Sequence, residues 1–154
     1  MRLTQLTDYA MRVLLHLAQN PGRLWTIAEV AARYDISEAH LMKITHQLGL
    51  TGWLATVRGK GGGMRLAKAP QDINLGALAR SIEPDFAVVE CLGTGNTCTL
   101  TGHCGLTGVM QGAVAQFMQH LDRFTLADVL PTPGPAAQPV RLSPARRTAR
   151  APAG

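Results

Sequence analysis

The feature that most constrains this fold is a run of three short helical patterns followed directly by a glycine-rich hairpin. In the first pattern, apolar residues recur along one helical face: Leu6, Tyr9, Ala10, Val13, Leu14 and Leu17. Pro21 and Gly22 are expected to end that helix. A second helix is predicted to begin at Thr26, because Thr26 and Glu29 have the spacing of a capping box. It is expected to stop near Asp35.

A third helix is predicted to begin after Ser37, a good N-cap residue. Its apolar residues fall on the inward face: Leu41, Ile44 and Leu48. Its outward face carries small, polar and basic residues: Ala39, His40, Lys43, His46 and Gln47. Two short helices of this kind, joined by a tight turn, are typical of a helix-turn-helix whose second helix enters the major groove.

Two short strands, at residues 53–57 and 64–66, are predicted to form a hairpin around the basic, glycine-rich segment 58–63. Residues 52–71 hold four basic side chains and no acid, so this wing can lie against phosphate. The interface with double-stranded DNA is therefore predicted to use Ser37, His40, Lys43, Gln47, Arg58, Lys60, Gly61 and Arg65.

The charge of the chain is divided unevenly along its length. Residues 1–70 carry nine Lys and Arg against four Asp and Glu, whereas residues 71–130 carry two against six. We therefore assign residues 1–70 to DNA binding and residues 71–130 to a different role. Residues 131–154 hold six of the nine prolines and no aromatic residue, and are expected to be a disordered tail. No segment reads as a signal peptide or membrane span, so a cytoplasmic location is expected.

The second part is predicted to contain two helices around a cysteine loop. Residues 74–82 have the spacing of a short connector helix. A longer apolar stripe follows the loop: Leu106, Val109, Met110, Ala113, Val114, Phe117, Met118 and Leu121. Such a long apolar face in a small protein favours a homodimer. The expected fold is thus mainly α: a winged helix-turn-helix with a small β-hairpin wing, a cysteine loop and a long dimerisation helix.

The three cysteines, Cys91, Cys98 and Cys104, follow a Cys-x6-Cys-x5-Cys pattern. Disulfides are rare in a reducing cytosol and three cysteines cannot all pair within one chain, so a metal or redox role is favoured. Thiolates suit iron-sulfur chemistry, and three of them leave one iron in need of another ligand. A zinc site that includes His103, or free thiols acting as a redox switch, are the alternatives.

Residues 1–130 resemble the NsrR-type nitric-oxide-sensitive repressors, a group of winged-helix iron-sulfur regulators. The resemblance rests on the segment 6–12 (Leu-Thr-Asp-Tyr-Ala-Met-Arg), the helix-turn-helix, the wing sequence Arg-Gly-Lys-Gly-Gly at 58–62, and Glu90 before Cys91. The first gap between cysteines is one residue longer than expected of that group.

This resemblance implies a dimeric repressor with one cluster per subunit, held by Cys91, Cys98 and Cys104 and by Asp8 of the opposite subunit. Arg12, one helical turn from Asp8, would steady that carboxylate. A 4Fe-4S cluster is favoured and a 2Fe-2S cluster is possible. Nitric oxide would be the signal that releases DNA. In the sister group that regulates iron-sulfur assembly, a histidine three residues after the last cysteine is a ligand, and Thr107 stands there in this chain.

Three other functions compete with this hypothesis. A regulator that senses iron or iron-sulfur cluster status is the main alternative. A zinc-stabilised DNA-binding protein would keep both halves of the pattern but would not respond to nitric oxide. An iron-sulfur electron carrier or enzyme would leave the basic helix and wing unexplained, so the chain is not expected to be an enzyme.

Overall fold

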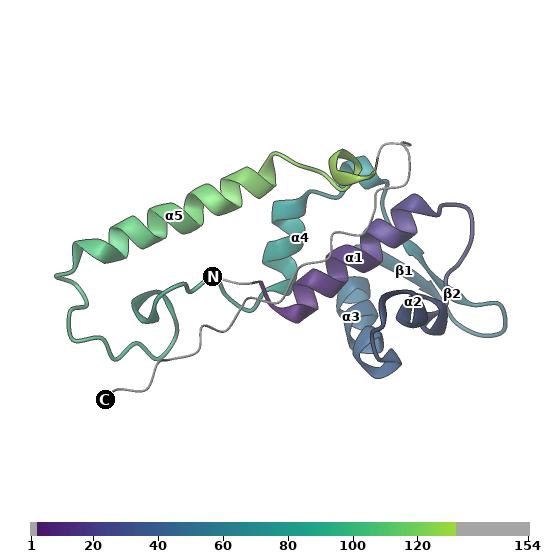
Figure 1. Cartoon of the computed structure of the whole chain (residues 1–154), viewed down its shortest axis with the longest axis horizontal. Helices are drawn as coiled ribbons and strands as arrows, with labels where there is room; N and C mark the ends of the chain where they lie inside the picture. Colours follow the sequence, from purple (N-terminus) through teal and green to yellow (C-terminus); the bar gives the residue numbers. More distant parts are fainter. Residues whose placement is uncertain (1–2, 132–154) are drawn as a thin grey trace, which may run out of the picture.

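The computed structural model describes residues 3–131. Its elements in chain order are α1 (Gln5–Gln19), α2 (Ile27–Tyr34), α3 (Glu38–Leu50), β1 (Leu54–Val57), β2 (Gly63–Leu66), η1 (Pro70–Asp72), α4 (Leu75–Ile82), η2 (Glu90–Leu92), α5 (Gly105–Asp122) and η3 (Ala127–Val129). The helices α1, α2 and α3 pack together beside the antiparallel hairpin β1–β2 (Figure 1). The predicted fold class, mainly α with a winged helix-turn-helix, is confirmed.

The predicted helix caps are present. The Thr26 hydroxyl accepts a hydrogen bond from the Glu29 amide at 3.2 Å, and the Glu29 carboxylate accepts one from the Thr26 amide at 2.8 Å. The Ser37 hydroxyl accepts from the His40 amide at 3.3 Å. Between these helices Asp35 has a positive φ of 54°, which lets the chain reverse within a tight turn. Local hydrogen bonds thus define the helix-turn-helix.

One hydrophobic core joins α1, α2, α3 and the wing to α4. Its fully buried side chains come from α1, α2, α3, β2 and α4 and from the segments just before α4 and after α5: Val13, Leu14, Val30, Leu41, Ile44, Leu48, Met64, Ile73, Leu78 and Leu126. Trp25 adds a further backbone pairing to the hairpin, because it exchanges two hydrogen bonds with Met64. Helix α3 and the wing therefore share one packed core.

The tip of the wing depends on glycine. Gly59 and Gly61 have φ values of 97° and 78°, a backbone conformation that L side chains rarely adopt. At Gly62 a Cβ atom would collide with the Val57 carbonyl oxygen. The turn therefore presents backbone and the Lys60 side chain to its surroundings without other bulk.

Helix α5 extends away from the winged helix, and the cysteine loop lies at its far end (Figure 1). Helix α5 includes every residue of the predicted apolar stripe. Met118 is its one buried residue within the described chain. Within residues 3–131, no helix has both the length and the apolar character needed to cross a bilayer. Of the tail predicted to be disordered, residues 131–154, all but Pro131 lie outside the described residues.

His16 is a buried polar residue in this core. It is 6% exposed, and its ring stands edge-on to Trp25 at 4.3 Å and to Tyr34 at 5.6 Å. Its Nε2 atom has no hydrogen-bond partner among the described residues. Burial lowers the pKa of His16, and the nearby cations Arg33 and Arg23 lower it further, against a smaller opposing effect of Glu29.

Stability is therefore expected to fall in mild acid. Because the folded chain holds the pKa of His16 below the ordinary value of 6.5, the unfolded chain binds the proton more readily. Stability is complete above that value and is lost as pH falls below it. Urea unfolding between about pH 7.5 and pH 5.5 should show a smaller loss for His16→Phe than for the wild-type chain. Equal losses for both proteins would contradict this assignment.

Candidate nucleic-acid interface and cysteine cavity

The outer face of α3 carries the side chains that are free to meet DNA. Leu41, Ile44 and Leu48 are fully buried, as their spacing predicts. Lys43 and His46 are exposed on the opposite side of the helix. None of the ion pairs among residues 3–131 involves Lys43. A free cation therefore stands at the centre of the predicted reading surface.

His40 and Gln47 lie at the side of α3, between its buried face and the exposed face that carries Lys43. His40 is half-buried, and its ring stands edge-on to Tyr9 of α1 with the centroids 5.3 Å apart. Gln47 is also half-buried. Ser37 uses its hydroxyl as the N-cap of α3. All three predicted site residues thus lie on α3 or at its start. Two of them already have partners within the protein: His40 contacts Tyr9, and Ser37 caps the helix.

His46 is not among the residues predicted to bind DNA. It is exposed and borders a groove between α3 and the wing, together with Arg58. Its outward position on α3 was visible in the sequence, but no local signal distinguished the flank facing the wing from the flank facing α1. The packing of α1 on α3 makes that distinction.

The predicted wing residues gather on one exposed hairpin. Arg58, Lys60 and Gly61 are exposed at its turn. Arg65 is exposed on β2, opposite Ala55 of β1. In the part of the chain that the structure describes, no carboxylate forms an ion pair with these three cations. The wing can therefore approach a polyanion without breaking an internal contact.

Lys60→Ala is expected to weaken DNA binding by a similar factor on every sequence. Lys60 is exposed at the turn, and we expect it to contact phosphate rather than bases, so its loss should reduce the slope of log affinity against log salt by about 1. Gln47→Ala serves as the comparison, because removal of a base contact changes sequence preference instead. A salt titration of both variants on two duplexes checks this, and an unchanged slope for Lys60→Ala would rule out the phosphate contact.

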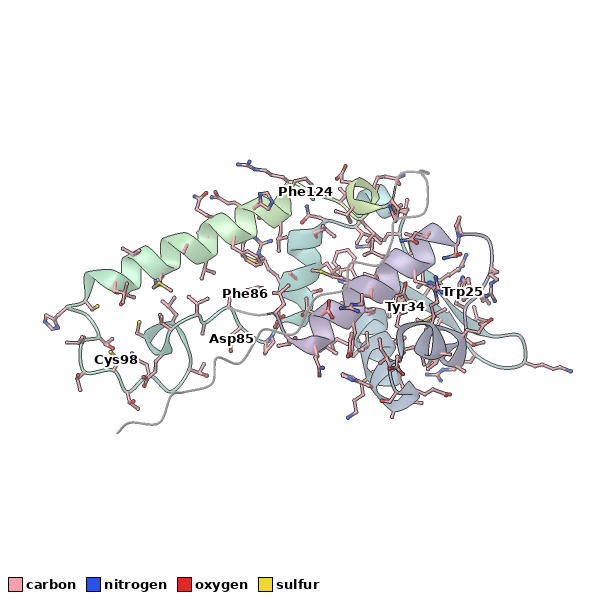
Figure 2. All side chains as sticks on the ribbon, in the orientation of Figure 1. Trp25, Tyr34, Asp85, Phe86, Cys98 and Phe124 are labelled. Atoms are coloured by element: carbon pink, nitrogen blue, oxygen red, sulfur yellow. The ribbon has the colours of Figure 1, made fainter. Side chains whose placement is uncertain are left out.

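The three cysteines line one small cavity at the end of α5. The cavity measures about 160 Å³ and is bordered by Val89, Glu90, Cys91, Cys98, Leu100, Thr101, Cys104, Leu106 and Thr107. Figure 2 shows Cys98 in this loop, well away from Trp25 and Tyr34 of the winged helix. Residues spread over a loop of the sequence therefore share one site, and its neighbours include the apolar side chains Leu100 and Leu106.

Short hydrogen bonds fix the loop around Cys98. The Asn96 side chain accepts from the Cys98 amide at 2.9 Å, and the Thr101 hydroxyl donates to the Cys98 carbonyl at 2.8 Å. Glu90 accepts from the Thr97 amide at 3.0 Å and also from its hydroxyl. The bond from the Thr97 hydroxyl has the larger effect and the bond from its amide the smaller, and both hold the pKa of Glu90 below its ordinary value. These polar residues thus bond to the backbone and to one another rather than to the Cys98 thiol.

Thr107 and His103, the two residues considered as further ligands, have different positions. The Thr107 hydroxyl lies 3.4 Å from the Cys91 sulfur, inside the cavity. His103 is exposed and does not border the cavity. Of the two, Thr107 is the one that the structure brings to the thiols.

Asp8 and Arg12 form an ion pair on the exposed side of α1. Arg12 Nη2 lies 2.8 Å from Asp8 Oδ2, and Arg12 Nε donates to Asp8 Oδ1 at 3.2 Å. Both side chains are about half exposed. Asp8 is not among the residues that border the cysteine cavity of its own chain. The predicted pairing of Asp8 with Arg12 is present.

Comparisons with known proteins agree with this architecture. The Rrf2 family model, described as an iron-dependent transcriptional regulator, matches residues 3–132. The HTH-type transcriptional regulator NsrR of Bacillus subtilis is 44% identical over 132 residues, which cover 84% of this chain and 90% of that protein. The protein of the same name from Bacillus licheniformis is 45% identical and is covered to 92%. Both are named as transcriptional regulators and not as enzymes.

Solved structures share the fold. T. potens IscR matches with a TM-score of 0.65 and 26% identity, covering 83% of this chain and 85% of that one. CymR, described as the global cysteine regulator of B. subtilis, matches with a TM-score of 0.68, covering 84% and 95%. Its identity is 21%, so this second likeness concerns the fold alone.

Proposed function

This chain belongs to the Rrf2 family of transcriptional regulators, and from that premise we propose that it is a cytoplasmic homodimeric repressor controlled by nitric oxide. It binds double-stranded promoter DNA through α3 and the wing, and it releases DNA when nitric oxide reaches an iron-sulfur cluster. The observation that carries the proposal is the single cavity lined by Cys91, Cys98 and Cys104, outside the DNA-binding surface.

The residues of the cavity fit an iron-sulfur cluster. Its donors are three thiols, which are soft ligands suited to iron and sulfide. Among residues 3–131, no three His, Cys, Asp or Glu side chains converge closely enough to hold a single metal ion. Three thiolates together with one oxygen donor favour a 4Fe-4S cluster in our proposal, with 2Fe-2S as the other form. When bound, the cluster would supply an iron without a thiolate, open to nitric oxide.

The apolar surface around the cavity supports a dimer. Leu100 and Leu106 border the cavity and are exposed, and Val109 follows on the same face of α5. Apolar side chains gathered in one patch favour contact with another protein surface. A second copy of this chain covers the patch in our proposal, and its α1 brings Asp8 to the cavity as the ligand that is not a thiol.

A line of contacts runs from Asp8 to the recognition helix within one subunit. The Asp8 carboxylate holds Arg12, whose guanidinium lies 5.8 Å from the centre of the Tyr9 ring. Tyr9 in turn contacts His40 of α3. Ligation or release of Asp8 therefore changes the charge held beside Arg12, and Tyr9 and His40 are placed to convey the change to α3. For such a switch the two states must differ in DNA affinity.

Asp8→Ala is expected to uncouple DNA binding from nitric oxide. The thiols remain, so iron should still bind, but with an altered visible spectrum. Promoter affinity should fall by about tenfold, in the usual range of coupling between sites, and nitric oxide should no longer change it. Anaerobic purification, iron and sulfide analysis and a DNA titration with and without nitric oxide measure all three. Asp72→Ala, which removes another exposed carboxylate, is the matched control and should behave as wild type.

The same experiment tests the proposed function as a whole. Wild-type protein that carries no iron, or whose DNA affinity does not change on addition of nitric oxide, would rule it out. One observation favours a second candidate: the matching family model is described as iron-dependent. A regulator of that kind would release or bind DNA when an iron chelator removes its metal, and it would be indifferent to nitric oxide.

A further inference from the structure

Exposed apolar side chains gather at a second place in the molecule, on the DNA-binding surface. Within residues 3–131, the large apolar side chains that are exposed include Leu50 at 71%, Met42 at 57% and Val57. All three border one groove. The dimer contact proposed above involves α5 and the cysteine loop, so it leaves this groove unexplained.

The groove lies between α3, the start of α2 and the wing, and its volume is about 730 Å³. Met42 and Leu50 come from α3, Ile27 from α2, and Val57 from β1. The polar groups beside them include His46 and Arg58. An apolar surface is thus set directly beside groups that can bond to bases and phosphates.

The charges around the groove indicate its occupant. Among residues 3–131, no Asp or Glu borders it. Arg58 lines one wall, and Lys43, Lys60 and Arg65 are exposed on the same two elements without an ion-pair partner in the described chain. A basic surface of this kind, on a helix-turn-helix and its wing, is complementary to nucleic acid. An apolar protein partner would have to bury these cations.

We infer that Met42 and Leu50 read thymine through its C5 methyl group in the major groove. Thymine is the one base that presents a methyl group there, whereas cytosine presents an amino donor at the facing edge. A methyl group removed from water by Met42 or Leu50 favours T·A over C·G without a hydrogen bond. The inference rests on the proposed function, and it adds that apolar contact, beside the basic residues, determines the sequence that α3 prefers.

The test exchanges thymine for deoxyuridine, which removes the methyl group and keeps the base pairing. A preferred duplex is first selected with the full-length protein from a random library. Each thymine of the two half-sites is then replaced by deoxyuridine, and affinity is measured by fluorescence anisotropy for the wild type, Met42→Ala and Leu50→Ala. Val129→Ala removes an exposed apolar side chain outside the groove and is the matched control.

For the wild type and Val129→Ala, deoxyuridine at one or more positions should weaken binding by about three- to fourfold per methyl group. For Met42→Ala or Leu50→Ala, that penalty should vanish at the same position. Indifference of the wild type to deoxyuridine at every position, with DNA binding intact, would overturn the inference and leave the proposed function standing. An equal loss of affinity of the variants on both duplexes would also overturn it, and would indicate that the groove serves another occupant. Failure to select any duplex would overturn both.

Discussion

Replacing Cys98 with serine is expected to abolish the iron-sulfur absorbance of anaerobically purified protein and its response to nitric oxide. Serine keeps the size and the backbone hydrogen bonds of this position, which come from Asn96 and Thr101 and not from the thiol. The substitution therefore exchanges a soft sulfur donor for a hard oxygen and little else. The cavity offers three thiols in all, so the loss of one should reduce iron content to a small fraction of that in the wild type.

His103→Ala is the matched control for this prediction. His103 is two residues along the same loop segment from Thr101 but does not border the cavity, so its removal should leave iron, spectrum and nitric oxide response unchanged. Iron and acid-labile sulfide assays, with a visible spectrum, provide the measurement. Loss of metal from His103→Ala would point instead to the zinc site considered from the sequence. Retention of a full cluster by Cys98→Ser would show that Cys98 is not a ligand.

Replacing Val109 with aspartate is expected to convert the proposed dimer to a monomer. Val109 is 66% exposed and Leu106 is 57% exposed, one turn apart on α5. A carboxylate in the middle of a buried dimer contact would lose its hydration without a partner, at a cost of several kcal/mol. One subunit can hold one half-site alone, so DNA affinity should fall by about a hundredfold or more as the gain from bivalent binding is lost.

Sedimentation or light scattering measures the mass directly, and a DNA titration measures the affinity. Gln111→Asp introduces the same charge on the exposed opposite side of α5, because successive residues of a helix are rotated by about 100°. That variant should remain a dimer. A dimeric Val109→Asp protein would mean that another surface joins the subunits.

The sequence by itself determined the elements whose signals are local. The capping box at Thr26 and Glu29, the N-cap at Ser37 and the apolar spacing of α1 each depend on residues within one or two turns, so they could be identified before the structure was known. The glycine-rich turn of the wing and the cysteine site could also be predicted, because both predictions depend only on residue type and spacing.

Only the tertiary structure decided which of those residues meet. Tyr9 of α1 occupies the flank of α3 that bears His40, and the wing leaves the other flank, with Met42 and His46, open to the groove. Thr107 reaches the Cys91 thiol because the start of α5 packs against η2. The His16 ring is buried against Trp25 and Tyr34, and the spacing of these residues in the sequence does not predict that contact. These contacts join distant parts of the chain, and they are set by how whole elements pack in three dimensions, whereas helix periodicity and caps are set by backbone hydrogen bonds close in sequence.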